Sequence, residues 1–363
     1  MSVLDRIGQK LLFSFDPETA HGLSIAALRC GLPVASTARP DARLPDARLK
    51  VSLCGLDFPN PLGMAAGYDK NAEVPDALLK LGFGFAEVGT ITPLPQPGNP
   101  KPRIFRLTAD DAVINRLGFN NEGHDAAEKR LAVRKGRPGI VGVNIGANKD
   151  SADRVNDYER GVARFAPHAS YLTVNISSPN TPGLRNMQAR EQLGELLARV
   201  MAARAKAPAQ PPVFLKIAPD LAEAELEDVA AEVAEKKVDG IIVSNTTLAR
   251  TGLRSKTGAG EAGGLSGKPL FERSTIVLAK MRRLLGRDMA IIGVGGVDSA
   301  ETALEKIRAG ADLVQLYTGM IYAGPALPGR IVAGMARLVE RERLGSIRDL
   351  RDSACERWAS KPL

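Results

Sequence analysis

Aromatic residues are scarce in this sequence, where Phe, Trp and Tyr together make up 4% of 363 residues. The 49 Lys and Arg residues outnumber the 41 Asp and Glu residues, which gives a formal net charge of +8. Proteins that hold single-stranded nucleic acid combine such charge with stacking rings, and no Lys/Arg block is interleaved with aromatics here. We therefore expect no nucleic-acid partner, and the charge suits an anionic membrane or an anionic small ligand.

Cysteine and histidine are also rare and scattered. The three cysteines include no CxxC pair, and the three histidines lie far apart. This pattern argues against a disulfide framework and favours a reducing cytosol. No His/Cys cluster has the spacing of metal ligands, so the sequence predicts no bound metal.

Long apolar runs are missing as well. No stretch approaches the roughly 18–20 residues needed to span a bilayer. The N-terminus lacks a signal-peptide core followed by a small-residue cleavage site. The apolar content of 44% and the charged content of 25% are typical of a soluble globular protein.

The first 30 residues predict two short amphipathic helices. Apolar side chains recur on one face of residues 3–12, and Asp16-Pro17-Glu18 indicates the start of the second helix. The pair is predicted either to lie on a membrane surface or to pack as a hairpin on the main domain. Residues 31–50 are predicted to be a connector and residues 51–58 a short hairpin.

Beyond residue 60 the chain repeats one unit: a short apolar strand, a polar or Gly-rich loop and an amphipathic helix. Eight strands are predicted, at residues 61–65, 85–89, 140–144, 171–176, 213–217, 240–244, 290–294 and 312–316. Eight such units favour an α/β fold, a (β/α)8 TIM barrel with a small N-terminal helical extension. An open doubly wound sheet is the alternative, which the strand count and the lack of an early GxGxxG fingerprint weaken.

One insertion interrupts the repeat between the second and third strands. Residues 103–107 and 112–117 are predicted to pair as extended segments around a turn at Asp110-Asp111. The loop would lie on the carboxyl side of the barrel, where we expect a lid or a wall of the substrate site.

The stretch YLTVNISSPNTPGLR, at residues 171–185, predicts a strand that ends in a functional turn. Its first half alternates as a buried strand does, and Pro179 and Gly183 end the strand near Ser178. In a parallel barrel the carboxyl ends of all strands meet at one mouth, where ligands bind. Asn175, Ser178 and Asn180 are therefore predicted to face a ligand; the alternative is a polar loop that only caps the strand.

The other strand ends add three kinds of group. A ring of neutral amides suits a planar, amide-rich heterocycle; these amides are Asn115, Asn144, Asn175, Asn180 and Asn245. Lys70 and Lys216 at one interior mouth need an anionic partner, because an unpaired buried charge is costly. Gly-rich turns at residues 293–296 and 317–319 predict phosphate binding. Acid–base chemistry is assigned to Ser178 or a lysine, because no His, Cys or acidic pair lies among these ends.

Together these segments resemble a known family. MAAGYDKN, INRLGFNN, VNIGANK, NISSPNTPGLR, SNTT, GGLSG, GVGG and YTG are similar to the motifs of dihydroorotate dehydrogenase of class 2, the membrane-associated, quinone-dependent class. The resemblance covers nearly the whole chain, including the N-terminal helices. It implies an FMN-containing (β/α)8 barrel that oxidises dihydroorotate to orotate in pyrimidine (UMP) biosynthesis and passes the electrons to a membrane quinone.

The resemblance also implies residue roles. Ser178 matches the catalytic base that removes the C5 proton of dihydroorotate, while hydride passes from C6 to flavin N5; the soluble classes carry Cys there. The implied substrate contacts are Lys70, Asn115, Arg116, Leu117, Gly118, Phe119, Asn175, Asn180, Asn245 and Thr246. The implied FMN contacts are Ala66, Gly67, Tyr68, Asp69, Lys70, Thr90, Asn144, Asn175, Lys216, Ser244, Gly267, Gly296, Tyr317 and Thr318.

Finally, the resemblance assigns a role to the N-terminus. It divides the chain into residues 1–40, a helical segment for membrane contact and quinone access, and residues 41–363, the catalytic barrel. His21 and Arg106 are expected to line the quinone tunnel, and the protein to be peripheral on the cytoplasmic face of the cell membrane. Three rivals stay open: a soluble relative that uses fumarate or NAD, a non-redox barrel acting on a phosphorylated sugar or nucleotide, and a non-catalytic binding module.

Overall fold

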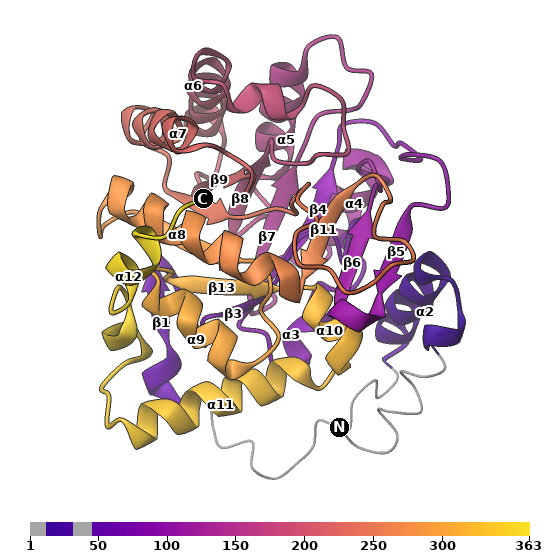
Figure 1. Ribbon diagram of the computed structural model, residues 1–363. Helices are drawn as coiled ribbons and strands as arrows, with labels where there is room; N and C mark the ends of the chain where they lie inside the picture. The colour runs from indigo at the N-terminus through magenta and orange to yellow at the C-terminus, as the bar shows by residue number, and fades with distance from the viewer. Residues whose placement is uncertain (1–11, 32–45) are drawn as a thin grey trace.

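A computed structural model describes residues 12–31 and 46–363, and in it eight parallel strands close into a barrel (Figure 1). In ring order the strands are β3 (Leu62–Met64), β4 (Phe85–Ile91), β7 (Ile140–Ile145), β8 (Tyr171–Asn175), β9 (Val213–Ile217), β10 (Gly240–Val243), β12 (Ala290–Val294) and β13 (Leu313–Leu316). The predicted (β/α)8 fold and all eight predicted strands are confirmed.

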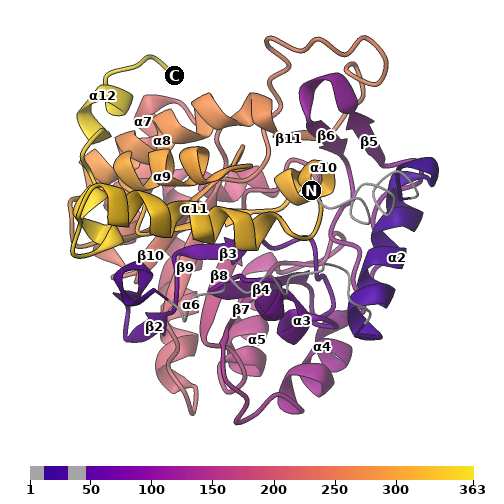
Figure 2. The ribbon, with the colours of Figure 1, turned by 90° about the horizontal axis from the view of Figure 1, so that it is seen from below.

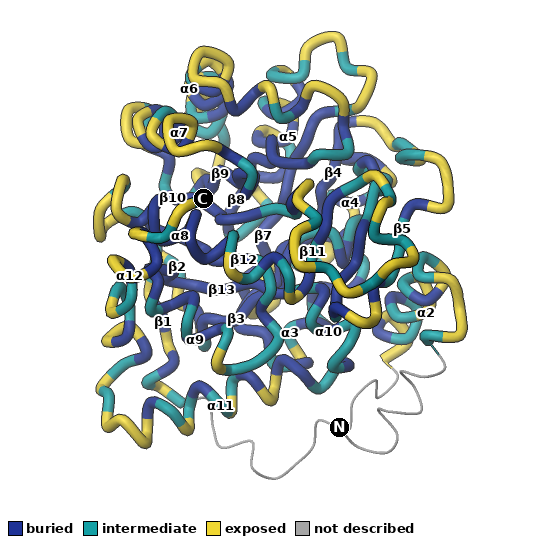
Figure 3. The backbone as a smooth tube through the Cα atoms, viewed as in Figure 1, coloured by how far each residue is buried: buried dark blue, intermediate teal, exposed yellow. Residues whose placement is uncertain are grey.

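Helices surround the strands and form the outer layer (Figures 1 and 2). They are α3 (Pro75–Lys80), α4 (Gly123–Ala132), α5 (Arg154–Phe165), α6 (Arg190–Lys206), α7 (Glu223–Glu235), α8 (Phe271–Leu285), α9 (Ala300–Arg308), α10 (Thr318–Ala323), α11 (Leu327–Arg341) and α12 (Cys355–Ala359). In Figure 3 the barrel strands are buried, while exposed residues lie mainly on the outward faces of helices and on loops. Helix α7 shows why: Leu226, Val229 and Val233 share one face and are buried.

Aromatic rings fill the barrel at the amino-terminal ends of its strands. Three fully buried rings each stand opposite a glycine of a neighbouring strand; the pairs are Phe85 with Gly63, Tyr171 with Gly142, and Phe214 with Gly240. A Cβ atom on any of these glycines would lie 2.1–2.4 Å from a ring atom. The large residue therefore needs the small one beside it, as expected for a barrel interior packed with side chains.

Two short antiparallel pairs flank the barrel where the sequence predicts them. Strands β1 (Val51–Leu53) and β2 (Leu56–Phe58) form the first hairpin, whose Phe58 ring packs edge-on against Phe85 at 5.2 Å. Strands β5 (Ile104–Leu107) and β6 (Ala112–Asn115) form the second, inside the insertion after β4. The first hairpin thus adds to the aromatic layer, and the second lies at the opposite end of the barrel.

A third strand, β11 (Gly264–Gly267), extends the second hairpin and was not predicted. It pairs antiparallel with β6, so that Gly264 stands opposite Asn115. A Cβ at Gly263 would lie 2.3 Å from the Asn115 carbonyl oxygen, which explains why glycine precedes this strand. The predicted lid is therefore a three-stranded sheet built from two distant parts of the chain.

Helix α2 (Pro17–Arg29) begins where the sequence predicts it, with Asp16 as N-cap and Pro17 in the first position. It lies beside β5 (Figure 1) and is fixed there by the ion pair of Glu18 with Arg103 at 2.6 Å. The Tyr68 hydroxyl also donates to Ser24 Oγ at 3.0 Å. In its described part, the second predicted helix therefore packs on the barrel.

Other N-terminal predictions lie outside the described residues: most of the helix at residues 3–12 and the greater part of the connector at 31–50. The division of the chain at residue 40 stays a prediction. Among the described residues, no helix combines the length and the apolarity needed to cross a membrane.

The aromatic–glycine pairs generate a stability prediction. Gly142→Ala places a Cβ 2.1 Å from the Tyr171 ring, so the ring or the strand must shift. We expect the free energy of unfolding to fall by about 1–3 kcal/mol, as for other overpacked cores. Urea unfolding measures this, with Gly260→Ala as the matched control, because nothing lies within 4 Å of a Cβ there. Equal stability of the two variants would contradict the packing role.

Candidate active site

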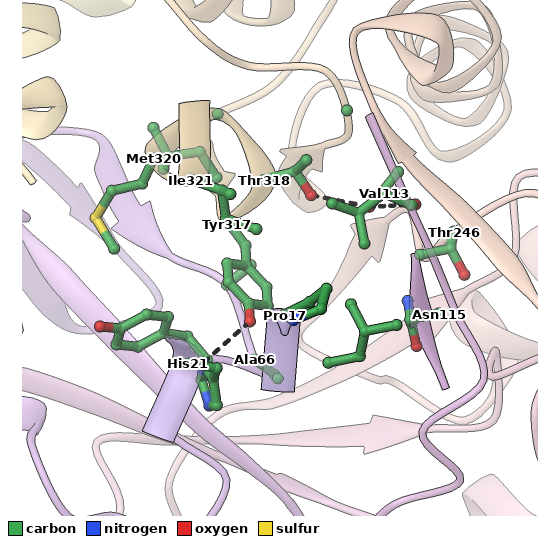
Figure 4. A pocket seen from close by; sticks show the side chains of 18 of the residues that line it. Pro17, His21, Ala66, Val113, Asn115, Thr246, Tyr317, Thr318, Met320 and Ile321 are labelled. Atoms are coloured by element: carbon green, nitrogen blue, oxygen red, sulfur yellow. Dashed lines mark hydrogen bonds between the residues drawn. The ribbon is translucent and has the colours of Figure 1, made fainter. Parts of the chain in front are cut away.

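A cavity of about 1060 Å³ opens at the carboxyl-terminal ends of the barrel strands. Its walls also include the β5–β6–β11 sheet, α10 and α2. Figure 4 shows side chains from three of these elements around one space: His21 of α2, Asn115 of β6 and Thr318 of α10. Pockets for small ligands measure roughly 300–1,000 Å³, so this cavity lies at the upper end of that range.

Nearly all predicted site residues line this cavity. From the predicted substrate set these are Lys70, Asn115, Leu117, Gly118, Phe119, Asn175, Ser178, Asn180, Asn245 and Thr246. From the predicted FMN set they are Ala66, Gly67, Tyr68, Lys70, Thr90, Asn175, Lys216, Ser244, Gly267, Gly296, Tyr317 and Thr318. The structure thus brings both sets together, and the individual roles stay predictions.

Three predicted residues do not line the cavity. The Asp69 carboxylate accepts hydrogen bonds from the N–H groups of Glu73 and Val74, each at 2.8 Å, at the start of α3. Arg116 forms an ion pair with Glu261 at 2.7 Å. Asn144 is fully buried beneath the lining residues.

Asn144 belongs to a buried polar network that positions the cavity floor. Its Nδ2 donates to Glu87 at 2.8 Å, and its Oδ1 accepts from Thr90 Oγ1 at 2.5 Å. Asn175 Nδ2 donates to both Thr90 Oγ1 and Asn144 Oδ1, at 2.8 and 3.1 Å. The orientation of the Asn175 amide is therefore set by groups on two other strands.

Glu87 anchors this network and was missed in the sequence. It is fully buried, and its second oxygen accepts from the Tyr171 hydroxyl at 3.0 Å and from Gln315 Nε2 at 2.8 Å. Burial, with Glu87 beside it, raises the pKa of Tyr171 well above its ordinary value. An acidic residue inside the otherwise apolar strand FAEVGTI was the available signal.

Ser178 lies on the loop after β8 and is buried, with its Oγ accepting the backbone N–H of Asn180 at 3.2 Å. Asn180 Nδ2 in turn donates to Asn115 Oδ1 of the lid sheet at 3.3 Å. Thr246 Oγ1 lines the same cavity and is buried with no hydrogen-bond partner within residues 12–31 and 46–363. Buried hydroxyls normally have partners, so this one is suited to bind a ligand.

A chain of bonds joins the serine loop to α2. Asn99 Nδ2 donates to the Asn180 carbonyl at 3.1 Å, and the Asn99 carbonyl accepts from Arg103 Nη1 at 2.7 Å. Arg103 also holds Glu18 of α2 through two hydrogen bonds, at 2.6 and 3.0 Å.

Two lysines bring positive charge to the cavity. Neither the Lys70 nor the Lys216 ammonium group has a hydrogen bond or ion pair with the part of the chain that the structure describes. Burial lowers the pKa of Lys70 to about 8 and lowers the pKa of Lys216, although Glu87 acts in the opposite direction on Lys216. Buried ammonium groups without partners indicate a site for anionic groups.

The turn after β12 has a backbone form that requires glycine. Gly295 and Gly296 have φ values of 107° and 74°, in the region that favours glycine. A Cβ at Gly296 would lie 2.4 Å from Cβ of Phe271, so no other residue fits there. Across the cavity wall, Thr318 Oγ1 donates to Ser266 Oγ at 2.8 Å.

The face of α2 gives the cavity an apolar extension. Pro17, Ala20, His21, Ser24 and Ala27 recur at helical spacing and all line it. His21 packs edge-on against Tyr68 at 5.2 Å, and the Tyr317 hydroxyl lies 3.4 Å from its Nδ1 (Figure 4). Burial lowers the pKa of His21 to about 3, so its imidazole is neutral at pH 7.

Arg106 lies at the outer part of this extension. Its guanidinium donates to the carbonyls of Phe13 and Phe15 at 3.2 and 3.0 Å, and lies 4.6 Å from the centre of the Phe13 ring. Both residues predicted for the quinone tunnel therefore line the cavity, on its α2 side.

Residues 48–339 match the family model described as dihydroorotate dehydrogenase. The chain belongs to the dihydroorotate dehydrogenase family. It is 84% identical over 363 residues to a protein named dihydroorotate dehydrogenase (quinone) of Mesorhizobium japonicum, covering all of both chains. A protein of the same name from Chelativorans sp. is 65% identical, with 100% of this chain and 99% of the other covered. The chain is therefore an enzyme, an oxidoreductase of this family, and not a non-catalytic binding module.

Solved structures agree with this assignment. The ligand-free DHODH from Eimeria tenella is 41% identical, with a TM-score of 0.87 over 93% of this chain and 99% of that chain. The complex of DHODH from the same organism with ferulenol is 40% identical, with a TM-score of 0.86 over 93% and 95%.

The partly buried Lys70, whose pKa is lowered by burial of its ammonium group, predicts a pH dependence of stability. With its pKa at about 8 in the fold and near 10.5 when unfolded, the unfolded chain binds more protons between these values, so stability rises with pH there. Below pH 8 the charged lysine destabilises the fold, and Lys70→Met removes this penalty. In protein freed of small ligands, we expect the stability advantage of the variant to shrink by about 1–3 kcal/mol from pH 7 to pH 10.5. Urea unfolding across this pH range measures the free energy of unfolding of both proteins. A difference between the parent chain and Lys70→Met that does not change with pH would refute the prediction.

Proposed function

We propose that this enzyme oxidises dihydroorotate to orotate with FMN and passes the electrons to a membrane quinone, as a step of pyrimidine (UMP) biosynthesis. The observation that carries the proposal is one cavity that contains Ser178, two lysines without partners and an apolar extension along α2. The names of the relatives, which specify quinone, support the choice of electron acceptor. A family member that uses fumarate or NAD is less well supported by this cavity and by these names. Membership of the family excludes a barrel without redox chemistry.

The donor set of the cavity fits a flavin nucleotide. Lys216 offers positive charge to the polar edge of an isoalloxazine ring, beside the Asn175 amide that Thr90 and Asn144 hold in place. A Cβ at Gly67 would lie 3.9 Å from the Tyr317 ring, so the missing side chain leaves room there. The Gly295-Gly296 turn and Thr318 would hold the phosphate. Bound FMN would supply a two-electron acceptor for hydride.

The chain's own groups then arrange the proton transfer. Ser178 Oγ takes the proton from C5 of dihydroorotate and gives up its own hydroxyl proton to a hydrogen-bonded water, while hydride would leave C6 for the bound flavin. The Asn180 N–H, which donates to this oxygen at 3.2 Å, stabilises the negative charge that the oxygen gains as its own proton leaves. Lys70 would pair with the substrate carboxylate, and the Thr246 hydroxyl and the Asn115, Asn180 and Asn245 amides would bind the ring amides. The lid sheet and Phe119 exclude bulk water from the site. Serine is a weak base, so it can act only in a pocket that is closed in this way.

The apolar face of α2 supports the path for quinone. A lipid-soluble acceptor can enter beside Ala20 and reach the neutral pair of His21 and Tyr317. Phe15 and Leu23, 40% and 43% exposed, lie at the outer part of this path and are suited to contact a membrane. We place the protein at the cytoplasmic face of the cell membrane, bound peripherally.

The role of Ser178 is testable in the reductive half-reaction. Ser178→Ala removes the base, so flavin bleaching by dihydroorotate should slow by about 10²–10⁴-fold while bound flavin is retained. Stopped-flow absorbance measures the rate. Ser24→Ala, a serine lining the same cavity from α2, is the matched control and should keep the parent rate. An unchanged rate in Ser178→Ala would defeat the assignment.

The path along α2 is testable in the oxidative half-reaction. Ala20 is buried and lines the cavity, so Ala20→Trp should block quinone and slow flavin reoxidation by at least about tenfold. The rate at which dihydroorotate reduces the flavin should be unchanged in Ala20→Trp. Ala26→Trp, on the same helix but not lining the cavity, is the control. Quinone turnover unaffected by Ala20→Trp would rule out this path, and fumarate or NAD supporting turnover would favour the rival acceptor.

A further inference from the structure

Behind the Gly295-Gly296 turn lies a buried lysine that the reaction described above does not use. Lys306 of α9 is fully buried and points toward α8, its neighbour in the outer layer (Figure 1). Its Nζ donates to Ser274 Oγ at 2.6 Å and lies 5.0 Å from the centre of the Phe271 ring. Two helices thus enclose an ammonium group inside the molecule.

Lys306 lacks an acidic partner. No ion pair joins it to any Asp or Glu of the described residues, and burial lowers its pKa well below the ordinary value. The contrast is Lys280 of α8, nearly as buried, which pairs with Glu223 at 2.7 Å. A buried cation without a counter-charge destabilises a fold, so an anion close by would compensate it.

The contacts of Lys306 lead directly to the glycine turn. Ser274 Oγ, which accepts from Lys306, lies 3.2 Å from the carbonyl oxygen of Gly295. Phe271, whose ring lies against the ammonium group, touches the position that a Cβ of Gly296 would occupy. The same two side chains that hold Lys306 therefore also form the back of the turn.

We propose that Lys306 is a positioning residue for the phosphate of the flavin nucleotide: a buried charge behind the Gly295-Gly296 turn that favours a phosphate monoester on its cavity side. The inference rests on the proposed use of FMN. It adds that the selectivity for the nucleotide over the free flavin comes in part from a residue that touches neither. A cation behind a backbone turn in a low-dielectric interior acts over several ångströms, where it is poorly screened.

The test compares FMN with riboflavin, which has the same ring and no phosphate. For apoprotein of the parent chain and of Lys306→Met, the dissociation constants of both flavins are measured by quenching of flavin fluorescence. We expect Lys306→Met to weaken FMN binding by about tenfold or more and to leave riboflavin binding within about twofold. Riboflavin binding also shows that the variant is folded. The ratio of the two constants is a readout that a merely structural role would not change.

Two further variants complete the experiment. Lys280→Met removes a buried lysine that has its own acidic partner, so the ratio should stay at the parent value. Ser274→Ala removes the hydroxyl between Lys306 and the turn, and should lower the FMN preference even if Lys306→Met fails to bind riboflavin. An FMN preference unchanged in both Lys306→Met and Ser274→Ala, or lost equally in Lys280→Met, overturns the inference. A parent chain that binds no flavin would instead refute the proposed function.

Discussion

Closure of eight parallel strands into a ring forces the interior to be either filled or hollow, and this chain does both at opposite ends. At the amino-terminal end, three rings opposite three glycines fill the barrel. At the carboxyl-terminal end the strands finish in glycines, amides and lysines, and a cavity of about 1060 Å³ opens. The filled end fixes the register of the strands, and the register decides which side chains reach the mouth.

Between these two ends lies a polar layer that links them. Glu87 accepts from Tyr171, whose ring belongs to the packed layer, and from Asn144, which orients Thr90 and Asn175 at the cavity. Such a network stabilises one arrangement of the amides, because each member would be left without a partner in another. Lys70 and Lys216 are the exception, since neither ammonium group has a partner within residues 12–31 and 46–363.

Much of the fold could be predicted because each barrel strand is a short apolar run ended by Gly or polar residues. The site followed from topology, since the carboxyl ends of parallel strands meet at one mouth. Strand β11 could not be predicted, because GLSG has no strand pattern and pairs with residues about 150 positions earlier. Likewise Asp69 lies in a site motif but binds the backbone just before α3. Lys306 resembles an ordinary helix lysine in the sequence, and only the packing of α9 against α8 shows that it is buried.

Arg103 connects the α2 side of the cavity with the loop that carries Ser178. It holds Glu18 of α2 with one part of its guanidinium and the Asn99 carbonyl with another, and Asn99 holds the loop that carries Ser178. Displacing α2 therefore strains a bonded path that ends beside Ser178 Oγ. A substitution in α2 that widens or narrows the cavity on that side therefore also affects Arg103 and Asn99. We expect compensating substitutions at the residues of this path.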